Sequence, residues 1–101
     1  MCSFLTQQPD KVVFFSDPGH GWLRVKRAEI DKLDLMSKIS PYSYQSDDGH
    51  YVYLEEDCDL ARYADALKPD DPDSFTSWFR SVPRIYDDDE ILRNSLDHYQ
   101  P

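Results

Sequence analysis

The pattern of apolar and polar residues predicts a β-hairpin near the start of the chain. Residues 12–16 form a run of β-branched and aromatic side chains, and residues 22–25 form a second run in which apolar and basic positions alternate. The residues between the runs suit a turn, because Pro18 fixes φ at its second position and Gly19 accepts a positive φ at its third. An apolar pair three positions apart then predicts a short helix over residues 27–35, packed on this hairpin.

A second hairpin is predicted further along. Residues 39–45 alternate in polarity and contain Pro41, which predicts an edge strand because proline cannot donate a hydrogen bond to a ladder. Asp48-Gly49 then turns the chain into a strand at residues 51–54. Both predicted turns carry the pattern S-D-x-G-H, 30 residues apart. We attribute this repeated pattern to the residue types that turns prefer, and a duplicated ββα unit is the alternative.

Helices dominate the prediction for the second half. Apolar residues at i, i+3, i+4 and i+7 predict a helix over residues 60–67, with acidic residues at its N-terminus, where the helix dipole favours negative charge. Residues 69–73 form a stiff acidic connector that contains proline. Asp73 is expected to cap a further helix, which repeats the same apolar spacing until Pro83 ends it.

The last residues predict a short strand and a final helix. Residues 84–86 suit the strand, and the acidic run 87–90 leads into the helix. The residues expected on the buried side of this helix are Ile91, Leu92, Leu96 and Tyr99.

These elements predict one α+β domain over residues 1–101, with a polar lead-in at residues 1–10. The expected order is ββα-ββα-αβα, in which two antiparallel hairpins form a sheet packed by three to four short helices. A chain of 101 residues, 40% of them hydrophobic, is long and apolar enough for one compact core. That composition excludes a disordered acidic tail.

The charge distribution narrows the class of partner. Against 20 acidic residues the chain has 11 basic ones, a formal net charge of −9. The first 50 residues hold seven acids and six bases, a net of −1, whereas residues 51–101 hold 13 acids and five bases, a net of −8. Direct binding of nucleic acid is not expected, because it depends on Lys and Arg neutralising phosphates. The expected partner is a basic protein surface.

Eleven of the acids in the second half lie in three clusters, around positions 55, 70 and 87. Carboxylates along a rigid surface can imitate a nucleic-acid backbone, and a neighbouring tryptophan can anchor an interface. A solvated face that only keeps the protein soluble is the other interpretation. The residues predicted to bind the partner are Glu55, Glu56, Asp57, Asp59, Asp70, Asp71, Asp73, Trp78, Asp87, Asp88, Asp89 and Glu90.

An alternative site centres on the loop of His20, which lies between two glycines. Glycines allow a ligand to approach the backbone closely, and a loop imidazole can act as a base or a ligand. Trp22, Tyr42 and Tyr44 are the expected pocket walls of this small-ligand or enzymatic alternative. We favour a turn role for His20, and the discriminating observation is whether it meets His50 and the acids near position 55 in one cleft.

Cofactor, metal and nucleophile motifs are not found in the sequence. The three glycines form no GxGxxG or GxxxxGK[ST] pattern, and no CxxC, HxH or HxxxH spacing suggests zinc. Cys58 has carboxylates on both sides, which disfavours the thiolate that a nucleophile needs. We therefore expect a protein without enzymatic activity, cofactor or bound metal.

The N-terminal residues and the two distant cysteines set the expected location. The first ten residues lack a basic stretch followed by an apolar one, and the longest apolar run is residues 12–15. We expect a cytoplasmic protein that does not contact a membrane.

Three segments form a distinctive combination: DPGHGWLRV at 17–25, ISPYSYQ at 39–45 and YLEEDCD at 53–59. Together they resemble a family of small, mostly uncharacterised proteins of bacterial phages and plasmids. The resemblance covers about the first two-thirds of the chain and implies a role for no single residue. Because such mobile-element proteins include anti-CRISPR and anti-restriction inhibitors, it implies an inhibitor of a nucleic-acid-handling defence complex in the cytoplasm of a bacterial host. A structural homodimer, paired through the Pro41 strand or the C-terminal helix, is a third possibility.

Overall fold

The computed structural model describes residues 11–67 and 71–101. The predicted lead-in at 1–10 lies outside the described residues, as do Lys68 and, from the acidic connector, Pro69 and Asp70. The described chain has six strands and four helices, so the predicted α+β class is confirmed. In chain order they are β1 (Val13–Ser16), β2 (Gly21–Lys26), α1 (Arg27–Lys32), β3 (Tyr44–Gln45), β4 (Tyr51–Glu55), α2 (Asp59–Leu67), α3 (Pro72–Ser81), β5 (Arg84–Tyr86), α4 (Ile91–Ser95) and β6 (Asp97–His98).

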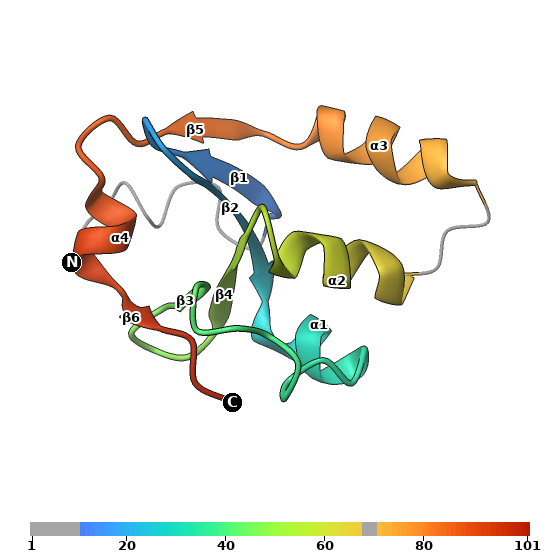
Figure 1. The fold of residues 1–101 in the computed structure, drawn as a ribbon, viewed down its shortest axis with the longest axis horizontal. Coiled ribbons are helices and arrows are strands. Elements are labelled where there is room, and N and C mark those ends of the chain that lie inside the picture. Colours follow the sequence, from blue (N-terminus) through green and yellow to red (C-terminus); the bar gives the residue numbers. More distant parts are fainter. Residues whose placement is uncertain (1–10, 68–70) are drawn as a thin grey trace.

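All six strands belong to one mixed sheet, in the order β5-β1-β2-β4-β3-β6 (Figure 1). Strands β1 and β2 pair antiparallel, as do β3 and β4, and β2 pairs with β4 to join the two hairpins. Strand β5 adds to β1 in parallel, with Ser16 opposite Tyr86. A parallel pair needs a long crossover connection. Here the whole chain between β1 and β5 provides it.

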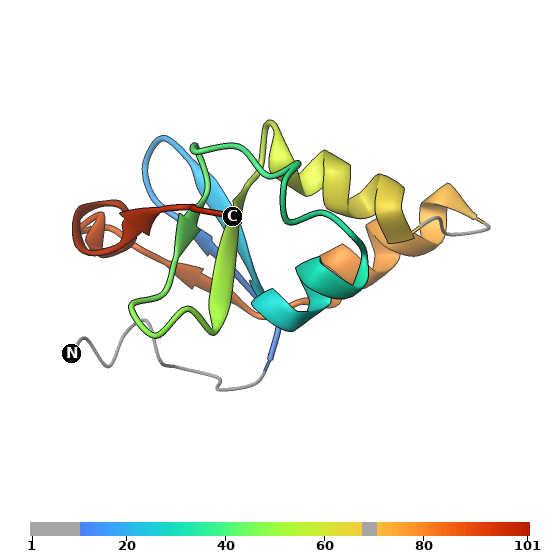
Figure 2. The same cartoon turned by 90° about the horizontal axis from the view of Figure 1, so that it is seen from below.

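The two faces of the sheet bury two separate apolar clusters. Side chains alternate along a strand, so Phe14 faces one cluster while its neighbours Val13 and Phe15 face the other. Helices α1, α2 and α3 pack on the first cluster, which includes Leu23, Ile30, Val52, Leu54 and Tyr63. The second lies under α4 and includes Trp22, Tyr44, Tyr53 and Leu92. Helix α4 lies at one end of the molecule, and the last turn of α2 and the start of α3 lie at the other (Figures 1 and 2).

The predicted Pro41 edge strand is wrong in two respects. Only Tyr44 and Gln45 of residues 39–45 form a strand, and this strand lies between β4 and β6 rather than at the edge of the sheet. Pro41 precedes the strand in a turn, where its missing N–H costs no ladder hydrogen bond. A homodimer paired through the Pro41 segment therefore loses its structural basis.

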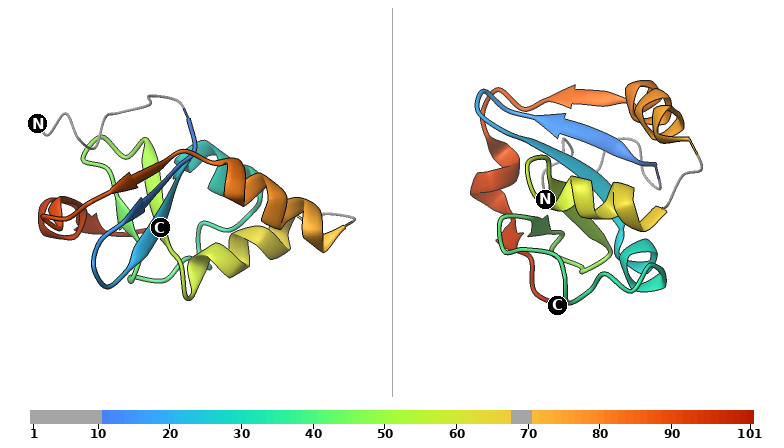
Figure 3. Two further views of the ribbon diagram at one scale, coloured as in Figure 1. Left: turned by 90° about the horizontal axis from the view of Figure 1, so that it is seen from above. Right: turned by 45° about the vertical axis from the view of Figure 1, so that its right-hand side comes forward.

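The cap of α3 is Asp71 rather than the predicted Asp73. The Asp71 carboxylate accepts a hydrogen bond from the backbone N–H of Asp73, 3.0 Å away. Pro72 takes the first helical position, where its fixed φ suits a helix and its missing N–H needs no partner. Figure 3 shows α3 running beside α2, with both helices projecting beyond the sheet.

The predicted C-terminal helix over Ile91 to Tyr99 is shorter than expected. Helix α4 ends at Ser95, and the extended backbone of Leu96 leads into β6, which pairs antiparallel with β3. As a result Tyr99 belongs to the cluster under α1 to α3, whereas Leu96 packs on the cluster under α4. The first helix is also shorter than predicted, because α1 ends at Lys32 and Asp34 adopts a left-handed φ of 60°.

The two S-D-x-G-H turns differ in their hydrogen bonds. In the first turn the Asp17 carboxylate accepts from the N–H groups of Gly19 and His20. In the second it is Asp48, one position later in the pattern, that accepts from His50. Gly49 has a φ of 73°, whereas Gly19 does not adopt the positive φ that the turn pattern predicts. These differences favour turn composition over duplication.

A substitution at Gly21 tests the packing between β2 and its neighbours. A Cβ atom there would overlap the ring of Phe14 and lie 2.9 Å from a carboxylate oxygen of Glu56. We expect Gly21→Ala to lower the free energy of unfolding by about 1–3 kcal/mol, because the ring must move from a well-packed site. At Gly19 the nearest atom to an added Cβ is 4.0 Å away, so Gly19→Ala is the matched control, with a change within about 0.5 kcal/mol. Urea unfolding of both variants measures the difference, and equal stabilities would contradict this packing.

Candidate functional site

Several connecting segments meet at one end of the sheet. Ser16 and Gly21 are paired residues at the end of the β1–β2 hairpin. The backbone N–H of Asp87, directly after β5, donates to the carbonyl of Ser16, and the N–H of Glu56, directly after β4, donates to the carbonyl of Gly21. The turns at 17–20, 56–58 and 87–90 therefore lie at the same end of the sheet, beside α4.

An open cleft of about 590 Å³ lies at this end of the sheet. Its volume falls within the range typical of small-ligand sites. It contains all four residues of the alternative site predicted from the sequence, together with five others. The lining residues are His20, Trp22, Tyr42, Tyr44, Glu55, Asp57, Cys58, Arg93 and His98.

A row of rings forms one wall of the cleft. The ring centroids of His20 and Trp22 lie 5.7 Å apart, those of Trp22 and Tyr44 5.8 Å apart, and those of Tyr44 and His98 4.8 Å apart. Trp22 and Tyr44 are buried, whereas Tyr42 is 67% exposed. The cleft is therefore lined by two buried aromatic residues and one exposed one.

His98 joins the cleft through β6 and was not predicted as a site residue. Its Nδ1 lies 2.7 Å from the carbonyl oxygen of Pro41. A carbonyl can only accept a hydrogen bond, so Nδ1 carries a proton. In the singly protonated ring, Nε2 is then the acceptor. No local sequence signal marks His98, because its place depends on the pairing of Tyr44 with the end of the chain.

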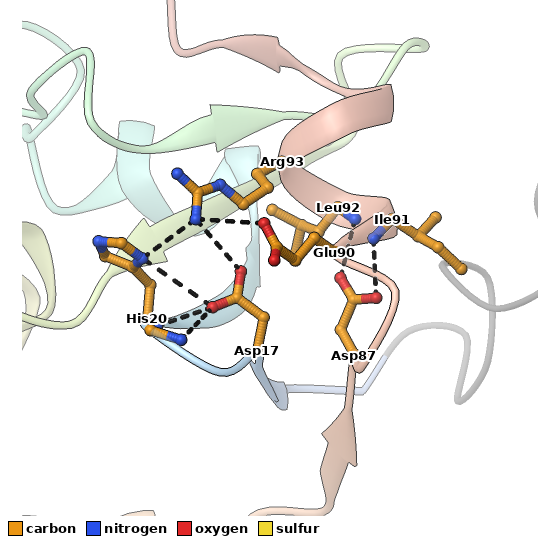
Figure 4. Close-up of polar contacts among 8 residues, drawn as sticks. Asp17, His20, Asp87, Glu90, Ile91, Leu92 and Arg93 are labelled. Atoms are coloured by element: carbon orange, nitrogen blue, oxygen red, sulfur yellow. Dashed lines mark hydrogen bonds and ion pairs between the residues drawn. The ribbon is translucent and has the colours of Figure 1, made fainter.

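The carboxylate of Asp17 organises the His20 side of the cleft (Figure 4). The Asp17 side chain is fully buried, and its Oδ1 accepts from the N–H groups of Gly19 at 2.9 Å and His20 at 2.8 Å. Nη1 of Arg93 lies 3.9 Å from Asp17 Oδ2, 3.5 Å from a Glu90 oxygen and 3.4 Å from Nδ1 of His20. Because a guanidinium only donates, this contact requires His20 Nδ1 to act as an acceptor. Like His98, Arg93 was not predicted as a site residue from the sequence.

His50 does not join His20. It lies in the turn between β3 and β4, at the opposite end of β4 from Glu55, and its ring contacts Tyr51 at 5.0 Å. His20 thus lines one cleft with Glu55 and Asp57 but without His50, so the observation that would favour the small-ligand alternative is met only in part.

Three of the carboxylates predicted to bind a partner are buried and serve the protein's own hydrogen bonds. Glu55 accepts from the N–H groups of Asp57 and Cys58. Asp59 accepts from the N–H and hydroxyl of Ser40 and from the hydroxyl of Ser43. Asp87 accepts from the first N–H groups of α4, those of Ile91 and Leu92. The surface-contact role predicted for Glu55, Asp59 and Asp87 does not fit their burial.

The remaining acids of the clusters around positions 55 and 87 form what we call the acidic rim: Glu56, Asp57, Asp88, Asp89 and Glu90. All of them are exposed except Glu90, which is partly exposed. Desolvation and the carboxylates of Asp57 and Glu55 raise the pKa of Glu56. Desolvation is the main cause of the rise, and repulsion by the neighbouring carboxylates adds to it.

The third predicted cluster lies elsewhere. Asp71 and Asp73 are exposed at the start of α3, at the opposite end of the molecule from α4 (Figure 1), and Asp70 lies outside the described residues. Trp78, 37% exposed, packs against Phe75 on the same helix. The structure therefore unites two of the three acidic clusters and leaves the third apart.

The cleft offers little for metal or nucleophilic chemistry. Within residues 11–67 and 71–101, no group of three or more His, Cys, Asp and Glu side chains is placed to hold a metal ion. Desolvation and the carboxylates of Glu55 and Asp59 raise the pKa of the Cys58 thiol. The thiol is therefore a poor source of thiolate at neutral pH.

Comparison with known proteins gives no family assignment: no family model, curated protein or solved structure matches the chain significantly. In the described parts of the chain, no helix has the length and apolar character needed to cross a bilayer.

The raised pKa of Glu56 leads to a prediction about pH. Its ordinary value is 4.5, and a raised value means that the native state binds this proton more tightly than the unfolded chain does. The resulting stabilisation is present at low pH and is lost as the pH rises through the raised pKa. Glu56→Gln should therefore increase the free energy of unfolding at pH 7, by at most about 0.5 kcal/mol because the side chain is exposed. Urea unfolding at pH 7 and pH 3 should show a higher free energy of unfolding for the variant only at pH 7. A lower free energy of unfolding at pH 7 would contradict the raised pKa of Glu56.

A second prediction separates the buried acids from the exposed ones. Asp59→Ala leaves the donors of Ser40 and Ser43 without their acceptor, so we expect a loss of about 2–3 kcal/mol in the free energy of unfolding. Asp57→Ala is the control, because this side chain is exposed, and its effect should stay within about 0.5 kcal/mol. Thermal unfolding measures both, and equal effects would refute the structural role of Asp59.

Proposed function

We propose that this protein is a non-enzymatic, acidic inhibitor that binds a basic, nucleic-acid-binding protein surface through the acidic rim. The proposal rests on the observation that two acidic segments lie at the same end of the sheet. The backbone N–H of Asp87 donates to the carbonyl of Ser16, and that of Glu56 donates to the carbonyl of Gly21. Acidic segments 31 residues apart in the sequence thus lie at the same end of the sheet.

The size of the acidic rim suits such a partner. Strands β5 and β4 are three strand spacings apart, so the segments that follow them lie about 14 Å apart. This distance exceeds the Debye length of about 8 Å at physiological salt, so each segment acts on the partner charges nearest to it. Arg93 lies beside the rim, but its guanidinium is already engaged by Asp17 and Glu90. A basic partner would therefore find the rim's net charge negative.

The class of partner follows from the resemblance to mobile-element proteins. Such proteins act in the cytoplasm of a bacterial host, and the complexes that threaten mobile elements hold DNA or RNA in basic channels. We propose an anti-CRISPR or anti-restriction type of inhibition, in which the rim occupies part of such a channel. The net charge of −9 supports this direction, because it disfavours direct competition for nucleic acid and favours attraction to the channel.

A second candidate function is the binding of a small ligand in the cleft. It is supported by one specific observation: His20, Trp22, Tyr42 and Tyr44 line a single hollow together with Asp57. The cleft adjoins the acidic rim, so the two functions are compatible in one molecule.

The test of the inhibitor function is a charge reversal at the rim. Asp88 and Asp89 are exposed and lie between β5 and α4. In a panel of purified restriction and CRISPR effector complexes, we expect the wild-type protein to block DNA binding by at least one complex in a mobility-shift assay. The Asp88→Lys/Asp89→Lys variant should need about tenfold more protein for half-inhibition, with a weaker dependence on salt.

The matched control is Asp47→Lys/Asp65→Lys. It changes the net charge equally, from −9 to −5, at exposed positions outside the rim. We expect less than a twofold change in half-inhibition for this variant. An equal loss in both variants would assign the effect to net charge rather than to the rim, and a wild-type protein that inhibits none of the complexes would contradict the proposed function.

A further inference from the structure

The cleft combines aromatic surface with uncompensated negative charge. Tyr42 lines it and is largely exposed, and the buried residues Trp22 and Tyr44 line it as well. Asp57, an exposed acid of the rim, lines the same hollow and lies two residues after the end of β4. Aromatic faces and carboxylates are the two kinds of group that bind a cation jointly.

We propose that the cleft receives an arginine side chain of the basic partner, with its guanidinium facing the Asp57 carboxylate and the ring of Tyr42. This inference rests on the proposed function, because it takes the partner to be basic, and it adds the residue type and the pocket that fix the orientation of the complex. The volume of about 590 Å³ is ample for one long side chain.

Several arginines of the protein itself lie over aromatic rings. Arg27 lies 5.1 Å from the ring centroid of Tyr99, and Arg84 lies 4.9 and 4.6 Å from those of Phe14 and Phe79. Arginine contacts with rings in the described residues involve none of the cleft's Trp22, Tyr42 and Tyr44. Within residues 11–67 and 71–101, the rings of Trp22, Tyr42 and Tyr44 thus have no arginine stacked on them, although Arg93 lines the cleft beside His20.

The charges around the cleft favour a cation over an anion. Arg93 lines one side, but Asp17 and Glu90 hold its guanidinium. On the side of Asp57, the carboxylates of Asp57 and Glu55 repel that of Glu56, and this repulsion adds to desolvation in raising the pKa of Glu56. A cation placed there would relieve this repulsion.

Arginine fits the cleft better than lysine because of its shape. A guanidinium is planar, so it can stack on a ring and bind a carboxylate through two N–H groups at once. An ammonium is more strongly hydrated and cannot stack. The cleft therefore distinguishes two cations of equal charge.

The probe for this inference is the peptide N-acetyl-Gly-Arg-Gly-amide, titrated into ¹⁵N-labelled protein and followed by NMR. We expect saturable shifts of the Trp22 indole N–H and of the backbone at Tyr42 and Asp57, with a Kd of about 1 mM. The lysine peptide should bind about fivefold more weakly. The peptide with citrulline, a neutral isostere of arginine, should give no saturable shifts. Equal binding of the citrulline peptide would overturn the inference.

Matched variants locate the binding. Tyr42→Ala and Asp57→Asn should each weaken binding of the arginine peptide about fivefold. Their controls are Tyr86→Ala, at a tyrosine that is 60% exposed and does not line the cleft, and Asp47→Asn, at an exposed acid in the β3–β4 turn. Unchanged binding in both cleft variants would also overturn the inference. All four side chains are exposed, so the variants should keep the wild-type NMR spectrum outside their own surroundings.

The two proposals fail separately. If the arginine peptide binds the cleft and the protein inhibits no defence complex, the cleft assignment holds and the proposed function is wrong. If the protein inhibits a complex and the arginine peptide leaves the cleft unshifted, the function holds and the arginine pocket is wrong.

Discussion

Strand β1 is paired along both of its edges and buried on both of its faces, and the arrangement of the sheet end depends on this. Val13 and Phe15 are fully buried against α4, while Phe14 packs against α3, where its ring meets that of Phe79 edge-to-face at 5.1 Å. With β2 on one edge, only the other edge remains for β5. The parallel pairing of β5 brings the C-terminal acids to the hairpin that the N-terminal half has built.

The acidic residues of this protein have two different physical roles. A carboxylate that is removed from water must accept hydrogen bonds, and Glu55, Asp59 and Asp87 do so from backbone N–H groups or serine hydroxyls. These buried acids hold the β4–α2 turn, the loop before β3 and the start of α4. Within the described parts of the chain, the exposed acids Glu56, Asp57, Asp88 and Asp89 accept no such hydrogen bonds, whereas Glu90 pairs with Arg93. Net charge therefore overstates the negatively charged surface, and position at the sheet end defines it better.

The cleft depends on the same construction. His20 and Trp22 come from the first hairpin, Tyr42 and Tyr44 from the segment that pairs with β4, and His98 from the last strand. Each segment alone presents only one or two of these side chains. The aromatic row and the carboxylates meet because the sheet order places β3 between β4 and β6. A ligand in the cleft would thus contact side chains from both hairpins and from the last strand.

The sequence by itself determined the α+β class and the approximate place of most elements, because hydrophobic periodicity, proline and turn residues act over a few neighbouring positions. It also indicated that His20, Trp22, Tyr42 and Tyr44 could line one pocket. Only the tertiary structure decided that Asp59 and Asp87 are buried, that β5 lies beside β1, and that Arg93 and His98 complete the cleft. Burial and long-range pairing depend on which distant surfaces meet, and a carboxylate or a histidine has the same local pattern whether it meets solvent or another strand.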